Sequence, residues 1–271
     1  MTEIRALQII ALCVSILAST ACNRSFTFIH LSDPQIGFLD DSPGYEHSDS
    51  LMKAAFYQAL SCKPDFVVNT GDLVNNPGDA VQDSIYKANL SILGKLPYWA
   101  LPGNHDIMGY SQEKRDDYLA KRGYDRFSFV HKGWAFLGID SNCIKDYTES
   151  DEAEQFGWLE AQLRASEGRK GIVVFFHHPV IRKDMDEPEE YFNLPVPQRE
   201  RYIGLFKKYG VKAVLTGHAH IPSMTVCDGI ACCTAGAVGS PLGGSRSGYA
   251  VVKISGRKLS WTFVPTEILL N

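Results

Sequence analysis

Five short apolar runs, rich in β-branched and aromatic residues, are each followed by residues that can bind metal ions. Runs of this kind are typical of buried strands. They cover Phe26 to Leu31, Phe66 to Asn69, Tyr98 to Leu101, Ile172 to Phe176 and Ala213 to Leu215. The clusters that follow are Asp33-Pro34-Gln35, Gly71-Asp72, Gly103-Asn104-His105-Asp106, His177-His178 and Gly217-His218-Ala219-His220. Because α/β sheets present ligand-binding groups beyond the carboxyl ends of their strands, the pattern predicts one site at one edge of a sheet.

Between these runs lie segments whose apolar residues recur at helical spacing. Four helices are expected, over Ser50 to Leu60, Ala80 to Leu93, Glu152 to Ala165 and Gln198 to Tyr209. Two hairpins are expected with turns at residues 132–133 and 228–229, and two more strands over residues 249–264. This alternation predicts sheets covered by helices. No internal repeat or low-complexity linker occurs, so a single catalytic domain is expected over residues 26–271.

The residue types in the clusters suit divalent metal ions, which take carboxylates, neutral imidazoles and amide oxygens as ligands. Two such ions about 3.5 to 4 Å apart can clamp the attacking and leaving oxygens of a phosphate ester. The pair needs a shared carboxylate, and Asp72 is the natural bridge. Taken singly, Asp33 and Asp72 could cap helices, Gly103-Asn104 could form a turn, and a lone histidine could pack in the core. Their common position after strands favours the metal site.

The order of these motifs resembles that of the calcineurin-like metallophosphoesterase superfamily. The motifs read Asp-x-(His or Gln), Gly-Asp, Gly-Asn-His-Asp, His and Gly-His-x-His, and the resemblance extends from Phe26 to about Val264. It implies an α/β fold, a four-layer α-β-β-α sandwich of two mixed sheets flanked by helices. It also implies a hydrolase in which a hydroxide bridging two metal ions attacks phosphorus in line.

The resemblance also implies which residues hold the two metal ions. Of the adjacent histidines, His177 is the expected ligand because similar proteins use the first histidine after the strand. His178 would point the other way if the strand continued. The implied set is Asp33 and His220 at the first site, Asp72 as the bridge, and Asn104, His177 and His218 at the second.

His105 is not expected to bind metal. In the family that it resembles, this histidine reaches the phosphate and acts as general acid or stabilises charge at the leaving oxygen. Asp106 would set its tautomer and raise its basicity. The catalytic pair implied by the resemblance is therefore His105 and Asp106.

Gln35 departs from the family pattern, which has histidine at this position. A glutamine carbonyl is a weaker and harder ligand than imidazole, so the first site should bind metal less tightly and favour Mn²⁺ or Mg²⁺ over Zn²⁺. Mn²⁺ is the principal expectation, with Fe, Zn and Mg as alternatives. Gln35 could bind the ion directly or contact a water molecule on it. The Asp-Pro-Gln motif also resembles a branch described as serine/threonine phosphatases, which favours phosphomonoesters.

Three functions remain open from the sequence. The first is a phosphomonoesterase acting on a phosphorylated small molecule or protein. The second is a cyclic-nucleotide or other phosphodiesterase, and the third is a lipoprotein that binds phosphorylated ligands without turnover. The net charge of -4 and the pI near 6.1 provide no general basic field, so strong nucleic-acid binding is not expected.

Residues 1–22 resemble a bacterial lipoprotein signal. Arg5 precedes an apolar run over residues 6–18, which is shorter than the roughly 20 residues needed to span a bilayer. Small residues then lead to Cys22, the expected lipidation site. The segment predicts an exported protein of the bacterial cell envelope, anchored to a membrane through its N-terminal lipid. The alternatives are an ordinary cleaved signal and a buried helix.

The segment from Arg182 to Pro197 lacks regular patterning and carries five acidic residues and three prolines. Long irregular loops in compact domains are usually functional, so it is expected to form a lid over the site, with a solvated acidic loop as the alternative. The cysteines are expected to be free thiols, although Cys227 and Cys232 flank a turn closely enough for a bridge.

Overall fold

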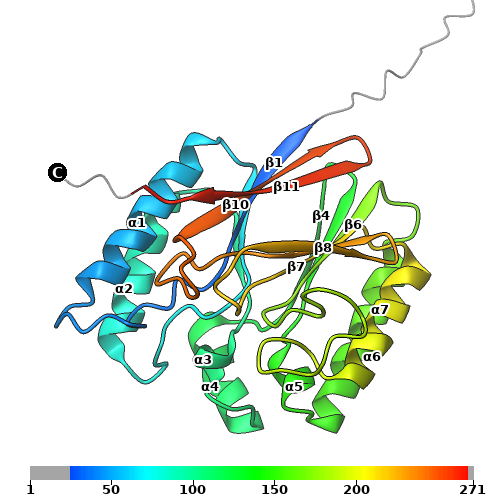
Figure 1. Cartoon of the computed structure of the whole chain (residues 1–271), viewed down its shortest axis with the longest axis horizontal. Helices are drawn as coiled ribbons and strands as arrows, with labels where there is room; N and C mark the ends of the chain where they lie inside the picture. Colours follow the sequence, from blue (N-terminus) through cyan, green and yellow to red (C-terminus); the bar gives the residue numbers. More distant parts are fainter. Residues whose placement is uncertain (1–24, 268–271) are drawn as a thin grey trace, which may run out of the picture.

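The computed structural model describes residues 25–267, which form two mixed β-sheets with helices on their outer faces (Figure 1). The first sheet has the strand order β11-β10-β1-β2-β3. β1 runs parallel to β2, β2 runs parallel to β3, and β10 is antiparallel to both β1 and β11. The strands are β1 (Phe26–Leu31), β2 (Phe66–Asn69), β3 (Tyr98–Ala100), β10 (Gly248–Ser255) and β11 (Lys258–Pro265).

The second sheet has the order β4-β5-β6-β7-β9-β8, with a parallel centre and an antiparallel hairpin at each edge. Its central strands are buried along their whole length, as expected for strands covered on both faces. The strands are β4 (Phe127–His131), β5 (Trp134–Gly138), β6 (Gly171–Phe175), β7 (Ala213–Thr216), β8 (Ser223–Cys227) and β9 (Ile230–Thr234).

Four helices form the outer layers, and three further helices, α3, α4 and α5, lie in the connections after β3 and β5. In Figure 1, α1 and α2 lie outside the first sheet, and α6 and α7 lie outside the second. The helices are α1 (Glu46–Ser61), α2 (Ala80–Leu90) with the 3₁₀ turn η1 (Ser91–Leu93), α3 (Asn104–Ile107), α4 (Gln112–Arg122), α5 (Asn142–Lys145), α6 (Glu149–Ala165) and α7 (Val196–Tyr209). The expected four-layer sandwich is confirmed.

Three hydrophobic clusters fill the three interfaces between these layers. The central cluster, between the sheets, is largely aromatic: the rings of Phe28 and Phe66 stack with centroids 4.8 Å apart, and Phe136 meets Phe28 edge-on at 5.5 Å. The other two clusters join α1 and α2 to the first sheet and α6 and α7 to the second. The two sheets are therefore held face to face by packed rings.

The expected helices and hairpins are all present, with helix bounds that differ by a few residues. α3, α4 and α5 were not predicted from the sequence. α4 is highly charged and buries only Tyr118, so it lacks the apolar spacing that marks a packed helix. α3 and α5 have four residues each, too short for a periodic pattern.

Two further expectations concern cysteines and the membrane. The five cysteines of the described part of the chain, including Cys227 and Cys232, are free thiols. Within residues 25–267, no helix combines the length and the apolar character needed to cross a membrane. The predicted signal segment and Cys22 lie outside the described residues.

The sandwich has two ends with different characters. The carboxyl ends of the parallel strands carry the motif residues 33–35, 71–72, 103–106, 177–178 and 217–220, and we call this the metal end. At the opposite end lie the turns over residues 131–134, 167–171, 210–212 and 255–258, which we call the base. β1 starts at the base and ends at the metal end, where the residues 33–35 follow it.

Candidate metal centre

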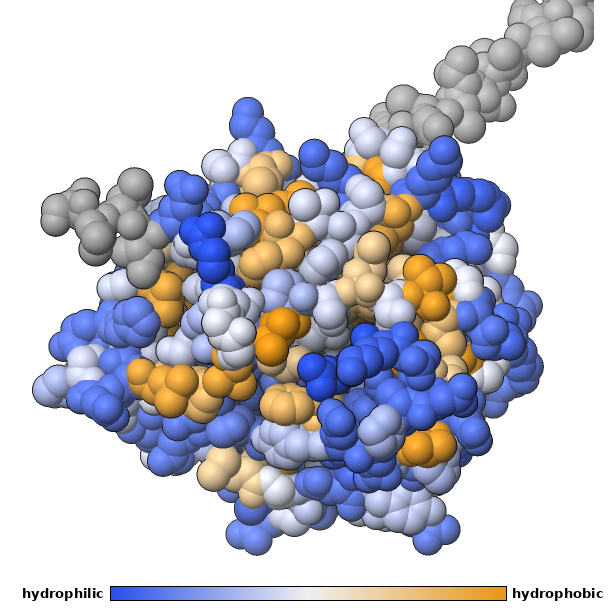
Figure 2. Space-filling model, viewed as in Figure 1, coloured by the Kyte–Doolittle hydropathy of each residue, from blue (hydrophilic) through white to orange (hydrophobic). Residues whose placement is uncertain are grey.

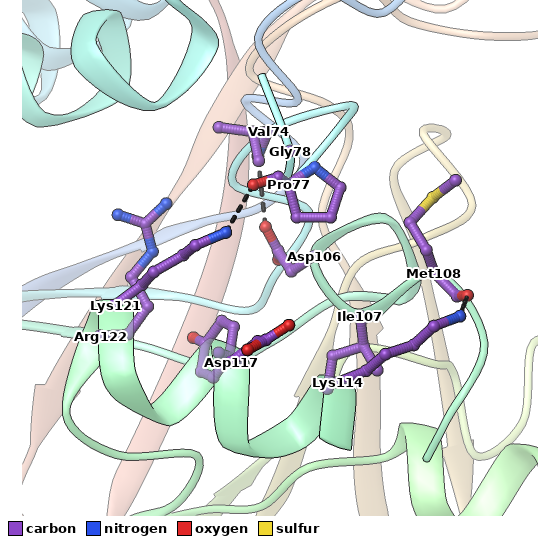
Figure 3. A pocket seen from close by; sticks show the side chains of 11 residues that line it. Val74, Pro77, Gly78, Asp106, Ile107, Met108, Lys114, Asp117, Lys121 and Arg122 are labelled. Carbon is purple, nitrogen blue, oxygen red and sulfur yellow. Dashed lines mark hydrogen bonds between the residues drawn. The ribbon is translucent and has the colours of Figure 1, made fainter. Parts of the chain in front are cut away.

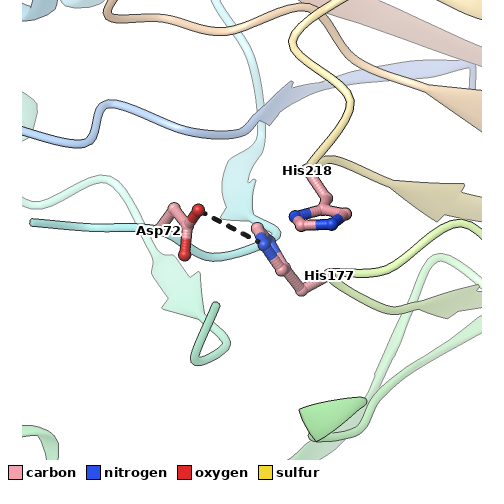
Figure 4. A group of neighbouring side chains, drawn as sticks. All are labelled: Asp72, His177 and His218. Atoms are coloured by element: carbon pink, nitrogen blue, oxygen red, sulfur yellow. Dashed lines mark ion pairs between the residues drawn. The ribbon is translucent and has the colours of Figure 1, made fainter. Parts of the chain in front are cut away.

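Two groups of potential metal ligands share the carboxylate of Asp72. The first group adds Asp33 and His220, and the second adds His177 and His218. In each group the ligand atoms lie within 4.8 Å of one another, and all five residues are buried. Figure 4 shows Asp72, His177 and His218 turned toward a common point from three separate loops. The six metal ligands implied by the family resemblance therefore include five that the fold gathers into two overlapping triads.

Glycines at the metal end let these loops approach one another. A Cβ atom on Gly103 would stand 2.1 Å from Oδ1 of Asp72, and one on Gly217 would stand 2.7 Å from Oδ2 of Asp33. Real Cβ atoms do not come so near a carboxylate oxygen. The glycine of the Gly-Asn-His-Asp motif and that of the Gly-His-x-His motif are thus needed for close approach of backbone to ligand.

Backbone N–H groups orient the two carboxylates. The N–H of His105 donates to Oδ1 of Asp72 at 2.8 Å, and the N–H of His218 donates to Oδ2 of Asp33 at 3.0 Å. The first loop is tied to the second through the N–H of Gln35, which donates to the carbonyl of Asp72 at 2.8 Å. Each carboxylate keeps an oxygen directed at a histidine, because only part of its acceptor capacity is used.

Backbone carbonyls fix the tautomers of two of the histidines. Nδ1 of His177 lies 2.9 Å from the carbonyl of Thr70, and Nδ1 of His220 lies 2.8 Å from that of Ser240. A carbonyl only accepts, so both Nδ1 atoms carry hydrogen, and Nε2 is the atom that each ring turns toward the site and would offer to a metal ion. Such second contacts orient metal-binding imidazoles. The Nε2 atoms face Asp72 at 3.4 Å and Asp33 at 3.5 Å.

The buried charges shift the pKa values of these groups in opposite directions. Burial alone would lower the pKa of His177, but the carboxylates of Asp72 and Asp33 outweigh it and raise that pKa to about 9. Burial, together with neighbouring His177, lowers the pKa of His218 to about 3. The histidines in turn hold the pKa of Asp33 and that of Asp72 below the ordinary value, against the effect of burial. The site is a concentrated set of buried charges that a divalent ion would neutralise.

Two amide side chains border the triads. Oδ1 of Asn104 lies 3.0 Å from Nε2 of His177, so Asn104 stands beside the second triad. Gln35 donates its Nε2 to Oδ1 of Asn75 at 3.2 Å, while its Oε1 is buried without a hydrogen-bond partner among the described residues. A buried acceptor without a donor needs an explanation. An ion at the first triad, or a water molecule on it, would satisfy this oxygen, and the donor set fits a hard divalent cation.

The expected contact between Asp106 and the ring of His105 is wrong. The carboxylate of Asp106 instead accepts the N–H groups of Gly103 at 2.8 Å and Leu73 at 3.0 Å, because it caps the N-terminus of α3. Burial and the nearby Asp72 raise the pKa of Asp106 to about 7. The His105 ring is oriented by the carbonyl of Asn75, which lies 3.2 Å from its Nδ1. Asp106 therefore shapes the loop and does not touch the imidazole.

The acidic segment over residues 182–197 reaches the site through Tyr191. Its hydroxyl accepts a hydrogen bond from Nδ2 of Asn104 at 3.2 Å, and its carbonyl lies 3.3 Å from Nε2 of His218. The ring lies 4.8 Å from that of His218 and is 60% exposed. The position of Tyr191 agrees with the expected lid.

The sequence analysis did not predict a role for the polar residues 140–142, which follow β5 and support the Gly103 loop. The Nδ2 of Asn142 donates to Oδ1 of Asp140 at 2.7 Å and to the carbonyl of Gly103 at 3.3 Å. Next to it, Ser141 contacts Nδ1 of buried His178 at 2.8 Å. The signal was present, since these residues also directly follow an apolar run, but they include no histidine.

A separate hollow of about 230 Å³ lies between α3, α4 and the loop over residues 74–78 (Figure 3). None of the candidate metal ligands lines it, although Asp106 does. Lys121 donates to the carbonyl of Pro77 at 2.6 Å, and Lys114 donates to that of Met108, so both amines are held at its rim. The hollow is therefore distinct from the metal centre.

Comparison with known proteins gives the same family as the motif order. The family model for calcineurin-like phosphoesterases matches residues 26–222. A serine/threonine-protein phosphatase CPPED1 of Danio rerio is 32% identical over 252 residues, covering 85% of this chain and 81% of the relative. A probable glycerophosphodiester phosphodiesterase GpdQ of Arcobacter nitrofigilis is 31% identical over 180 residues, 65% of this chain and 64% of the relative.

Solved structures agree on the fold. A dimetal phosphatase from Danio rerio superposes with a TM-score of 0.65 at 16% identity, over 89% of this chain and 99% of the other. The relatives are named as phosphatases and phosphodiesterases, which are hydrolases of phosphate esters. With its motifs on the strand ends of this sandwich, the chain belongs to the calcineurin-like phosphoesterase family and is a hydrolase acting on ester bonds.

Proposed function

We propose that this phosphoesterase uses two divalent metal ions and favours phosphomonoesters. The observation that carries the proposal is the position of Asp72, whose carboxylate belongs to both ligand triads. Two ions sharing it would lower the pKa of a water molecule toward neutrality and shield the phosphoryl oxygens. Asp33 and His220 would hold the first ion with Gln35, and the second would be held by Asn104, His177 and His218. Mn²⁺ fits the mixed oxygen and nitrogen donors best.

His105 supplies the proton for the leaving alkoxide in this proposal. Its Nδ1–H is committed to the carbonyl of Asn75, so the ring can donate a proton only from Nε2, and only when both ring nitrogens are protonated. Its backbone N–H is bonded to Asp72, which places the ring next to the bridging carboxylate. A histidine positioned in this way contributes about 10²- to 10⁴-fold to the rate.

The lid supports a preference for monoesters. Tyr191 contacts both Asn104 and His218, so it narrows the space on the side of the second triad. A diester has a second ester arm that needs room there. The relative named as a serine/threonine-protein phosphatase agrees with a monoester, whereas the one named as a glycerophosphodiester phosphodiesterase favours the alternative.

Rates on nitrophenyl phosphate and bis-nitrophenyl phosphate, with Mn²⁺ present, test the preference. We expect kcat/KM to be at least tenfold higher for the monoester. Tyr191→Ala should reduce this ratio by opening the site, while Tyr57→Ala, at an exposed tyrosine of α1, should leave it unchanged. A higher value for the bis-ester would assign the diesterase function. Tight phosphate binding without hydrolysis, with Mn²⁺, Fe²⁺, Co²⁺ and Zn²⁺ each tried, would indicate a non-catalytic binding lipoprotein.

We further propose export to the bacterial cell envelope with a lipid on Cys22, which the sequence of residues 1–22 supports. Two or more acyl chains give durable attachment to a membrane. Mass spectrometry of the protein purified from a bacterial membrane fraction should find an acylated Cys22 as the first residue. Cys22→Ala should abolish the modification, and an unmodified N-terminus in the wild type would contradict the proposal.

A further inference from the structure

The base carries an excess of free positive charge. Five cations there take part in no ion pair within the described part of the chain, and four of them are exposed, Lys170 being half-buried. They are Arg169, Lys170, Lys212, Arg257 and Lys258. The first four line one hollow of about 260 Å³. Glu167 is the unpaired carboxylate that also lines it, so this end is strongly basic although the chain has a net charge of -4.

Several other charges near the base are paired. Lys132 forms an ion pair with Asp65, and Lys208, which also lines the hollow, is bonded to Glu160 at 2.7 Å. Lys207 pairs with Asp228 at 2.9 Å. The five free cations therefore give this end a positive electrostatic potential, to which the exposed Lys63 and Lys95 before β2 and β3 add.

The turns that hold these cations are fixed to one another across the two sheets. Nε1 of buried Trp134 donates to the carbonyl of Gly256 at 2.9 Å, which joins the second sheet to the turn of Arg257 and Lys258. The N–H of Lys170 donates to the carbonyl of Gly133 at 2.9 Å. The backbone positions of these cations are therefore held close together, although their side chains extend into solvent.

The chain also enters the sandwich at the base. The ring of Phe26, the first residue of β1, lies 4.9 Å from that of His131 and 5.5 Å from Nζ of Lys132. Cys22 precedes Phe26 by four positions. Four peptide units reach at most about 14 Å, so a lipid on Cys22 would hold the base close to a bilayer in any conformation of those residues.

We propose that the base is a docking surface for an anionic lipid bilayer. The potential of anionic headgroups acts within about one Debye length of 8 to 10 Å, which the free cations of the base would enter once the start of β1 is near the membrane. The side of the molecule around the entry of β1 displays many hydrophilic residues (Figure 2). Docking through the base directs the metal end toward solvent, where phosphorylated substrates can reach it.

Partition of the full chain between buffer and lipid vesicles tests the proposal. Vesicles with 30% phosphatidylglycerol are compared with pure phosphatidylcholine, and the ratio of the two partition coefficients is measured. This ratio removes the contribution of the N-terminal anchor, which both vesicles accept, whether it is the uncleaved apolar run over residues 6–18 or a lipid on Cys22. Each cation near an anionic surface contributes about fivefold. Lys212→Gln with Arg257→Gln should lower the ratio about 10- to 25-fold.

The matched control is Lys53→Gln with Lys87→Gln, two lysines of α1 and α2 about half exposed. This variant should change the ratio by less than twofold, and 0.5 M salt should bring the wild-type ratio close to one. Melting temperature and nitrophenyl phosphate hydrolysis verify that each variant is folded, but the vesicle ratio does not depend on activity. A wild-type ratio near one, equal losses in the two double variants, or binding to duplex DNA in place of vesicles would overturn the proposal.

Discussion

The metal end and the base differ in the type of residue that adopts the left-handed backbone conformation, which has positive φ. At the metal end, five residues with side chains hold positive φ: Asp33 (52°), Gln35 (34°), Asp72 (51°), His218 (67°) and His220 (55°). At the base, glycines take this role at positions 133, 168, 210 and 256. Three residues with side chains also have positive φ near this end: Lys63 (49°), Lys132 (46°) and Asp228 (50°). Lys132 and Asp228 each hold the first position of a two-residue hairpin turn, which requires this conformation.

The metal end therefore holds its candidate ligands in a backbone conformation that lowers the stability of the fold. Left-handed conformation costs a non-glycine residue roughly 1 kcal/mol or more, and the cost persists only where surrounding structure imposes it. The metal end also has buried polar atoms without partners in the described structure, among them Oε1 of Gln35 and Oδ2 of Asp140. The base has free charges on its surface, where solvation makes them inexpensive.

Asp72→Asn should produce the largest loss. Removing the shared charge weakens both triads, so we expect loss of both metal ions and a decrease of about 10³-fold or more in kcat. Metal analysis and steady-state kinetics check this. Asp65→Asn at the base removes a partly exposed carboxylate paired with Lys132 and should change the unfolding free energy by less than about 1 kcal/mol, without loss of activity. Full metal content in Asp72→Asn would refute the bridge.

His105→Ala should reduce kcat by about 10²- to 10⁴-fold and leave metal content unchanged, because in the proposed mechanism the side chain donates a proton and binds no ion. His131→Ala is the matched change at the base, where the ring contacts Asp65. It should leave kcat unaltered. Loss of metal from His105→Ala would overturn the separation between ligand and proton donor.

Metal affinity should rise with pH. In the metal-free protein the pKa of His177 is raised to about 9, so at pH 7 the ring is protonated and must lose its proton to bind an ion. Mn²⁺ affinity should increase up to about tenfold per pH unit from 7 to 9 and then level off. Conversely, the ion pair of His177 with Asp72 stabilises the metal-free fold fully below about pH 6.5, and this contribution disappears as pH rises through 9. Calorimetric titration at several pH values measures the slope, and a flat profile would contradict the predicted proton release.

Gln35→His should have the smallest effect, a gain of about tenfold in affinity at the first site. The reason is that imidazole is a stronger ligand than an amide oxygen. Titration of metal-free protein should resolve two sites of unequal affinity in the wild type and a smaller difference in the variant. An unchanged first site would show that residue 35 contacts the ion only through water.

The sequence predicted much of the fold because strands and helices leave local periodic signals. The apolar runs before Asp33, Asp72 and His177 ended close to the positions predicted. The sequence did not predict α4, because this helix buries only Tyr118 and so has no apolar periodicity. The prediction that Asp106 orients His105 was wrong. The two residues are adjacent in the chain, but the Asp106 carboxylate accepts hydrogen bonds from backbone N–H groups such as that of Gly103.

The order and spacing of the motifs determined the family, the residue types of the site and the end of the sheet at which they lie. Those are local properties, fixed by strand length and by the chemistry of each side chain. Only the tertiary structure decided that Asp106 caps α3, that Asn75 orients His105, and that Tyr191 reaches Asn104. These contacts join residues far apart in the chain, so they depend on how the sheets pack, which no short stretch of sequence encodes.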